Sequence, residues 1–199
     1  MALTLVPKLT EEDFKMENIF FDISKLKSCG KNVIIGKTVR IRYPELVEIG
    51  DNVIIDDFTY ISTQLKIHDN VHISSGSKII GGRKALVEMK EFSTLAPNVV
   101  LSAGTDDYVG GIATPIVPME YKGNAVIGNI ILNKHCIVGA GSVVLPNVIF
   151  HEGACIGALS LANKNLDAWK LYAGIPVKFI KQRNKKQIKN FENKIENLK

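Results

Sequence analysis

The stretch "VEIGDNVIIDDFTYISTQLKIHDNVHISSGSKII" (residues 47–80) decides the fold, because isoleucine recurs in it at every sixth position. A period of six does not keep one face of an α-helix apolar, but it fits β-strands that alternate every second residue and bend at regular intervals. Repeats this short indicate a β-solenoid, in which each coil buries its side chains against the next. The six isoleucines are Ile49, Ile55, Ile61, Ile67, Ile73 and Ile79.

The same period extends well beyond this stretch. It runs without a miss from Val126 to Ala162, and small or turn-forming residues such as Gly139–Ala140–Gly141 fall where the chain must bend. A β-sandwich is the alternative, but the strands of a sandwich have irregular spacings. We therefore expect an all-β solenoid. Other members of the repeat are Cys29, Ile35 and Ile41, and then Met89, Leu95 and Leu101.

One long segment interrupts the repeat. Between Ala103 and Ala125 the chain reads "AGTDDYVGGIATPIVPMEYKGNA", and aliphatic residues no longer recur at every sixth position. Loops held by a rigid scaffold often carry function. We expect residues 103–125 to form an excursion loop that contributes to the site.

The two ends of the chain are predicted to differ from the solenoid. Thr10 to Asp13 have the composition of a capped start of a short N-terminal helix. A Lys/Glu/Asn-rich tail without Gly or Pro predicts a C-terminal helix that covers the end of the solenoid, which an open β-stack needs against edge-to-edge association. The expected parts are an N-terminal cap (1–28), a β-helix domain (29–166) and a C-terminal segment (167–199).

Charge and composition narrow the function. The net charge is +5, and seven basic residues fall between Lys181 and Lys199 without interleaved aromatic residues for base stacking, so we expect no nucleic-acid partner. No stretch approaches the roughly 18 apolar residues of a membrane span, which predicts no membrane insertion. Three isolated cysteines and the lack of a signal-like start favour a reducing, cytoplasmic location.

Four stretches resemble the hexapeptide-repeat acyltransferases: "IIGKTV", "EIGDNVIIDDF", "CIVGAGSVVLPNV" and "GACIGALS". The resemblance covers roughly residues 30–182 and is nearest to galactoside/maltose-type O-acetyltransferases and to the sugar acyltransferases of surface-polysaccharide assembly. It implies a left-handed parallel β-helix with three hexapeptides per coil, although crossovers between parallel strands are usually right-handed. It also implies a homotrimer with sites between subunits, acetyl-CoA as acyl donor, and a sugar or nucleotide-sugar acceptor.

The resemblance also implies where the donor binds. Two alanines match positions at which the backbone touches pantetheine, and their spacing of 18 residues would stack them one coil apart. Two lysines in "GIPVKFIK" match basic positions suited to phosphates, and an Asn-Lys pair matches a Thr-Lys pair. Tight corners and solvated lysines would explain the same residues. The implied cofactor-binding residues are Ala140, Ala158, Asn163, Lys164, Lys178 and Lys181.

The excursion loop departs from the resemblance at the catalytic position. Counting from "LS" (101–102) places Asp106 where the related enzymes carry a histidine. An aspartate with an ordinary pKa near 3.9 is a weaker base at neutral pH than histidine. Adjacent carboxylates and partial burial would raise the pKa of Asp106 or Asp107. Alternatively His72 or His135 serves as the base, or the acceptor is an amine that needs less help.

We therefore expect direct acyl transfer, in which a base assists the acceptor and backbone N–H groups stabilise the oxyanion. Asp107 and Tyr108 are further candidates for binding sugar hydroxyls, and the sequence leaves O- and N-acetylation open. A non-catalytic trimeric solenoid is one alternative. A gamma-type carbonic anhydrase is another, but the four histidines do not show the spacing of a three-histidine zinc site, and we expect no metal.

Overall fold

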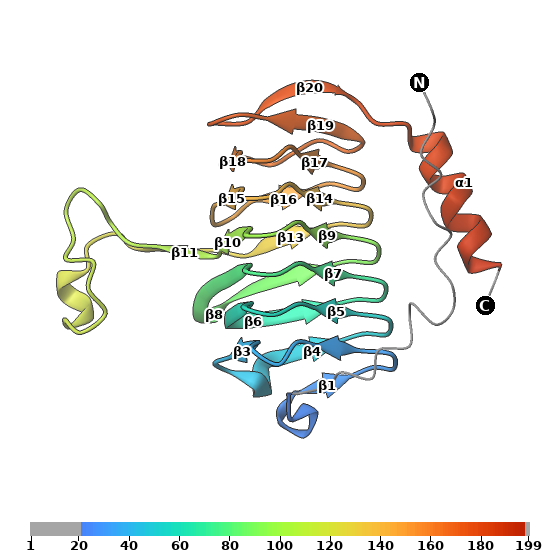
Figure 1. The fold of residues 1–199 in the computed structure, drawn as a ribbon. Coiled ribbons are helices and arrows are strands. Elements are labelled where there is room, and N and C mark those ends of the chain that lie inside the picture. Colours follow the sequence, from blue (N-terminus) through green and yellow to red (C-terminus); the bar gives the residue numbers. More distant parts are fainter. Residues whose placement is uncertain (1–20, 198–199) are drawn as a thin grey trace, which may run out of the picture.

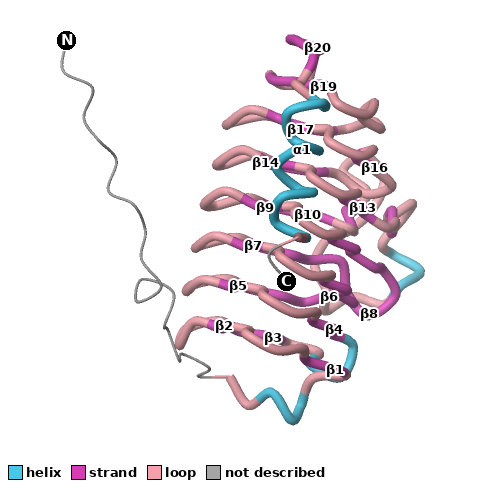
Figure 2. Tube along the Cα trace, turned by 90° about the vertical axis from the view of Figure 1, so that its right-hand side faces the viewer, coloured by secondary structure: helices cyan, strands magenta, loops and turns pink. Residues whose placement is uncertain are grey.

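The computed structural model describes residues 21–197, which form a three-sided parallel β-helix with a projecting loop and a C-terminal helix (Figures 1 and 2). The period of six is confirmed. Successive coils pair in parallel, commonly at an offset of 18 residues, as in Ile55 with Ile73 and Ile137 with Cys155. The six isoleucines of the repeat are all buried. The helix expected near Thr10 lies outside the described residues.

The first face is a sheet of very short strands, because the chain bends after every few residues. Its last strand, β20, runs antiparallel to β19, whereas all others are parallel. In order across the sheet these strands are β2 (Ile34–Ile35), β5 (Ile54–Ile55), β7 (His72–Ile73), β9 (Thr94–Leu95), β14 (Ile137–Val138), β17 (Cys155–Ile156), β19 (Lys170–Ala173) and β20 (Lys178–Gln182).

The second and third faces belong to one sheet, because β6 (Tyr60–Ile67) and β8 (Lys78–Met89) run through the corner between them. The second face also contains β3 (Arg40–Ile41), β10 (Val100–Ser102), β15 (Val143–Val144) and β18 (Leu161–Ala162). The third face also contains β1 (Ser28–Cys29), β4 (Val47–Ile49), β13 (Ile130–Leu132) and β16 (Ile149–Phe150).

Three corners connect the faces, and we number them by the faces they join. The first corner joins the first and second faces, the second corner joins the second and third, and the third corner joins the third back to the first. Short 3-10 turns η2 (Ile23–Lys25) and η3 (Pro44–Leu46) lie near the beginning of the described chain. Each corner repeats once per coil, so equivalent residues of successive coils stack in rows.

The excursion loop leaves the coils at the second corner, as expected. Strands β11 (Gly104–Thr105) and β12 (Val126–Ile127) pair antiparallel at its base, and η4 (Met119–Tyr121) lies in its outer part. The loop accounts for the offset of 43 residues between Leu95 and its partner Val138, where the other coils of this face have offsets of 16 to 22. It extends away from the stacked coils (Figure 1).

The C-terminal helix exists but not where it was expected. Helix α1 (Lys185–Glu196) lies along the third corner, beside several coils, and does not cover the end of the solenoid (Figures 1 and 2). The hairpin of β19 and β20 forms that end instead. The stacking also continues past residue 166, because β19 pairs in parallel with β17.

Candidate functional site

The first corner stacks the two alanines implied to touch the donor. Its turns repeat a left-handed residue, whose N–H group donates to the preceding coil, to a carbonyl in four turns and to the Thr38 hydroxyl in the turn of Phe58. Leu159 N–H thus donates to Ala140 O at 2.8 Å, which places Ala140 and Ala158 in adjacent coils. Gly139 is needed there, because an added Cβ would lie 2.4 Å from the carbonyl carbon of Gly157. The left-handed residues are Phe58, Gly76, Asn98, Gly141 and Leu159.

In the described chain, the two stacked alanines of this corner leave their N–H groups free. The carbonyls of Ala140 and Ala158 already accept hydrogen bonds, from Leu159 N–H and from Ser160 Oγ respectively. Within residues 21–197, by contrast, the N–H groups of the two alanines donate to no acceptor. A row of free N–H groups complements amide carbonyls such as those of a pantetheine arm. The corner therefore offers donors of the kind that a pantetheine arm needs, and its role as the donor site stays a prediction.

Large apolar side chains are exposed along the same corner. Phe58 and Leu159 are 72% and 73% exposed, and Ile175, in the turn after β19, is 75% exposed. Phe58 and Leu159 also have positive φ values of 62° and 51°, which is rare for bulky residues. Such backbone strain gathers at ligand-binding sites. The exposed apolar side chains make the first corner a candidate surface for a ligand or another chain.

The basic residues predicted to contact phosphates lie at the C-terminal end of the solenoid. Lys178 and Lys181 belong to β20, and Asn163 and Lys164 follow β18; all four side chains are exposed. In the described part of the chain, none of the three lysines forms an ion pair. They are free to meet an anionic group.

Asp107 holds the excursion loop together. Its Oδ1 accepts hydrogen bonds from the N–H groups of Val109 and Gly110 at 2.9 and 3.0 Å, and its Oδ2 accepts one from Asn124 N–H at 2.9 Å. These bonds lower the pKa of Asp107, led by the one from Asn124. The prediction of a raised pKa was therefore wrong for Asp107. Both carboxylate oxygens are engaged within the loop, which gives the residue a structural part beside its predicted sugar contact.

Asp106 and Tyr108 flank this structural aspartate and are both exposed. The Tyr108 hydroxyl accepts a hydrogen bond from Thr105 Oγ1 at 3.1 Å. Because the loop leaves at the second corner, Asp106 lies on a different corner from Ala140 and Ala158. One copy of the chain does not bring the predicted base and the predicted donor track together. The exposed apolar residues of the loop are Tyr108, Val109, Ile112, Ile116, Met119 and Tyr121.

His72 has a carboxylate partner that the sequence analysis missed. Its Nε2 lies 2.8 Å from Asp56 Oδ2, and both side chains are about half exposed on the first face. A carboxylate at one ring nitrogen orients an imidazole and leaves Nδ1 to accept a proton. Residues about 18 positions apart lie side by side in successive coils, and Asp56 and His72 are 16 positions apart. The coil length was therefore the signal from which this pair could have been predicted.

His135 is enclosed at the third corner. Only 7% exposed, it stacks on Phe92 with ring centroids 5.2 Å apart, and its Nε2 lies 3.0 Å from Glu192 Oε2 of α1. This geometry gives His135 a structural role in seating α1, and its predicted catalytic role is not favoured.

Among residues 21–197 no three metal-ligating side chains converge. No helix in that range has the length and apolarity to cross a membrane.

Comparisons with known proteins agree with this geometry. Residues 47–81 match the family described as bacterial transferase hexapeptide (six repeats). A dTDP-4-amino-4,6-dideoxy-D-glucose acyltransferase of Escherichia coli is 40% identical over 164 residues, covering 80% of this chain and 84% of that protein.

Solved structures give the same result. AntD, an N-acyltransferase from Bacillus cereus in complex with dTDP and 3-hydroxybutyryl-CoA, is 34% identical with a TM-score of 0.84, covering 96% of this chain and 97% of AntD. A galactoside acetyltransferase in complex with coenzyme A shares the fold at 20% identity and a TM-score of 0.54, over 89% of this chain and 72% of that one. The chain therefore belongs to the hexapeptide-repeat sugar acyltransferases, and its fold is the left-handed parallel β-helix of that family.

Proposed function

We propose that this enzyme transfers an acyl group from acyl-CoA to the amino group of a dTDP-linked 4-amino-4,6-dideoxy sugar. The observation that carries this proposal is the 40% identity, over most of both chains, to an acyltransferase named for that acceptor. AntD, which is similar over nearly its whole length, was solved with a thymidine nucleotide and an acyl-CoA. The free N–H groups of the first corner and the unpaired lysines of β20 supply the chemistry that an acyl-CoA donor requires.

The aspartate in the position of the family histidine supports an amine acceptor. An amino sugar is largely an ammonium ion near neutral pH, and a carboxylate both attracts that cation and takes up a proton from it. Histidine suits a neutral hydroxyl better. Asp106 is thus our first candidate for the base, and His72, oriented by Asp56, is the second.

The proposed reaction is direct. The ammonium ion first passes one proton through the base to solvent. The neutral amine then attacks the thioester carbonyl, the new C–N bond forms as the C–S bond breaks, and the base accepts the second proton, which the amine loses. That proton then leaves with the thiolate as the free thiol of coenzyme A. Backbone N–H groups stabilise the oxyanion, so no covalent enzyme intermediate is needed.

We also propose a homotrimer in which the excursion loop of one copy covers the first corner of its neighbour. Both surfaces expose apolar side chains, among them Tyr108 and Val109 on the loop and Phe58 and Leu159 on the corner. The pairing would bring Asp106 of one copy to the donor track of another. Acyl-CoA and nucleotide sugars are soluble metabolites, so we place the reaction in the cytoplasm.

The test is an acceptor panel analysed by mass spectrometry and by release of the coenzyme A thiol. The purified chain is given acetyl-CoA or 3-hydroxybutyryl-CoA with dTDP-4-amino-4,6-dideoxyglucose, and dTDP-glucose serves as the hydroxyl-only control. We expect an N-acylated product with the amino sugar and none with the control. Acylation of dTDP-glucose at a similar rate would contradict an amine-directed enzyme, and thiol release with neither sugar would contradict the acceptor class.

A further inference from the structure

The third corner changes its chemistry along the solenoid. In the first coils its left-handed positions are asparagines, whose side-chain amides bond to one another: Asn32 to Asn52 at 3.0 Å and Asn52 to Asn70 at 3.3 Å. In the later coils, beside α1, the same positions hold an aromatic strip. Its members are Phe92, His135, Gly153 and Trp169.

The aromatic strip forms a seat for α1. Phe92 and His135 stack nearly parallel, and Trp169 tilts against His135 with centroids 5.8 Å apart. Gly153 leaves room for Trp169, because an added Cβ would lie 2.4 Å from its Cε3 atom. From α1, Lys189 Nζ lies 5.9 Å from the centre of the Trp169 ring. The corner is thus built to receive this helix.

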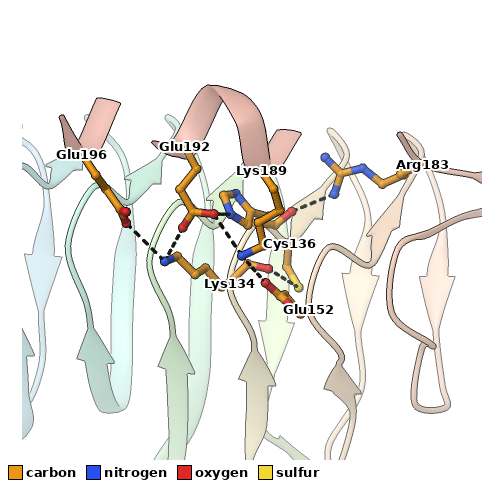
Figure 3. A network of polar contacts seen from close by, with 8 residues as sticks. Lys134, Cys136, Glu152, Arg183, Lys189, Glu192 and Glu196 are labelled. Carbon is orange, nitrogen blue, oxygen red and sulfur yellow. Dashed lines mark hydrogen bonds and ion pairs between the residues drawn. The ribbon is translucent and has the colours of Figure 1, made fainter. Parts of the chain in front are cut away.

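Glu192 anchors α1 in that seat. It is only 5% exposed, and its carboxylate meets Lys134, Lys189 at 2.9 Å and His135 at 3.0 Å (Figure 3). Lys189 also reaches Glu152 of the coil below the helix at 2.6 Å. A buried carboxylate is costly unless it is paired, and breaking such a network leaves buried charges without partners. The network therefore fixes α1 against two coils.

Arg183 fixes the chain just before the helix begins. Its Nη1 donates hydrogen bonds of 2.7 Å to the carbonyls of His135 and Gly153, and its backbone N–H donates to Trp169 O at 2.8 Å. Three successive coils thus hold one residue. Because Arg183 directly follows β20, the end of that strand is fixed as well.

Strand β20 depends on such contacts to hold its position. It is an edge strand with β19 on one side only, all five of its residues are exposed, and its register shifts between Leu171 and Tyr172. Edge strands with one partner are held less firmly than central ones. It also carries Lys178 and Lys181, the lysines assigned to the phosphates of the donor.

We infer that Glu192 and Arg183 are positioning residues: by locking α1 and its junction to the third corner, they hold the basic strand β20 where acyl-CoA binds. The inference rests on the proposed function, which assigns Lys178 and Lys181 to the donor. Neither Glu192 nor Arg183 needs to touch the cofactor. Their effect is on donor affinity and not on the chemical step.

Glu192→Gln tests the inference by the sign of its effect. Removal of a negative charge strengthens the binding of an anion if electrostatics alone operate. Positioning predicts the opposite: coenzyme A affinity, measured by calorimetry, falls about tenfold, and the KM for acyl-CoA rises while kcat stays within about twofold. Glu196→Gln is the matched control, since it removes the same charge one turn later from a half-exposed side chain, whose ion pair with Lys134 is long at 3.8 Å. It should leave both constants unchanged.

A second pair of variants has the opposite charge change. Arg183→Gln and Lys186→Gln each remove one positive charge, but Lys186 is exposed and, among the described residues, forms no ion pair. We expect Arg183→Gln to weaken coenzyme A at least about fivefold more than Lys186→Gln does. This pair of variants tests the positioning role even if Glu192→Gln does not fold.

The outcomes separate the two proposals. A folded Glu192→Gln enzyme that binds coenzyme A as tightly as its Glu196→Gln control would overturn the inference and leave the proposed function intact. Equal losses in Arg183→Gln and Lys186→Gln would do the same. A wild-type chain that binds no coenzyme A would overturn both.

Discussion

Two segments leave the hexapeptide repeat, and they differ in the contacts that hold them in place. Helix α1 is held by contacts within its own chain: Glu192 and Arg183 join it to coil corners, and aromatic rings pack beneath it. Among the described residues, the outer part of the excursion loop is held by hydrogen bonds of its own, three of them to Asp107, and it exposes Tyr108, Val109 and most of its other apolar residues. Within residues 21–197, the coils offer the loop no set of contacts comparable to those that hold α1.

The difference supports the proposal that the loop depends on another molecule. A helix with its own buried network contributes to the stability of one copy of the chain. A loop with exposed apolar side chains and a rigid internal frame is prepared for a surface outside that copy. Our account is that α1 serves stability and donor affinity, whereas the loop serves the reaction through a neighbouring subunit.

The largest effect should come from the loop. Asp106→Asn should lower kcat about 10²- to 10⁴-fold, the range of general acid–base assistance, without changing coenzyme A affinity or the melting temperature. Glu120→Gln, on the outer part of the same loop, is the matched control and should keep kcat. Steady-state kinetics and calorimetry measure both. Undiminished turnover in Asp106→Asn would remove this residue from the mechanism and leave His72 as the base.

A smaller effect, on stability, should come from α1. Burial raises the pKa of Glu192, but hydrogen bonds from Lys134, Lys189 and His135 outweigh it and lower the pKa from 4.5 to about 2. A lowered folded-state pKa stabilises the protein above the ordinary value, and that stability is lost as the pH falls from 4.5 to about 2. The shift corresponds to about 3 kcal/mol of the free energy of unfolding.

Urea unfolding across this pH range measures that loss. The wild type should lose about 3 kcal/mol more than Glu192→Gln, which has no carboxyl group to titrate at that position. Glu196→Gln should follow the wild type. Parallel pH profiles for the wild type and Glu192→Gln would show that this network does not stabilise the folded chain.

The repeat predicted the coils because one periodic row of aliphatic residues determines both strand and bend. The position of the excursion loop was equally readable, since the period stops at Ala103. The seat of α1 was not predicted, because it joins residues such as His135 and Glu192, which lie 57 positions apart outside any period. The role of Asp107 was missed for a related reason: its partners lie in irregular backbone, where no spacing rule predicts a hydrogen bond.

The smallest effect should come from the row of asparagines at the third corner, which belongs to the first coils and not to the coils beside α1. Asn52 has a φ of 56° and links the amides of Asn32 and Asn70. Asn52→Ala should cost about 1 to 2 kcal/mol in thermal or urea unfolding, because alanine tolerates the left-handed region poorly and cannot continue the row of amides. Glycine adopts the left-handed backbone without strain but also lacks the amide. Comparing Asn52→Gly with Asn52→Ala therefore separates the cost of the backbone conformation from the cost of the lost amide hydrogen bonds. An unchanged stability in Asn52→Ala would mean that the ladder contributes nothing.

The most direct test of the central claim is complementation between two inactive variants. Asp106→Asn carries a defective loop, and Ala158→Arg blocks the donor track of the first corner with a bulky side chain at an exposed position. If the loop of one copy acts on the corner of another, co-expressed and co-purified mixtures should recover about a quarter of wild-type kcat, the share of sites that random mixing leaves intact. A mixture as inactive as its two components would contradict the account.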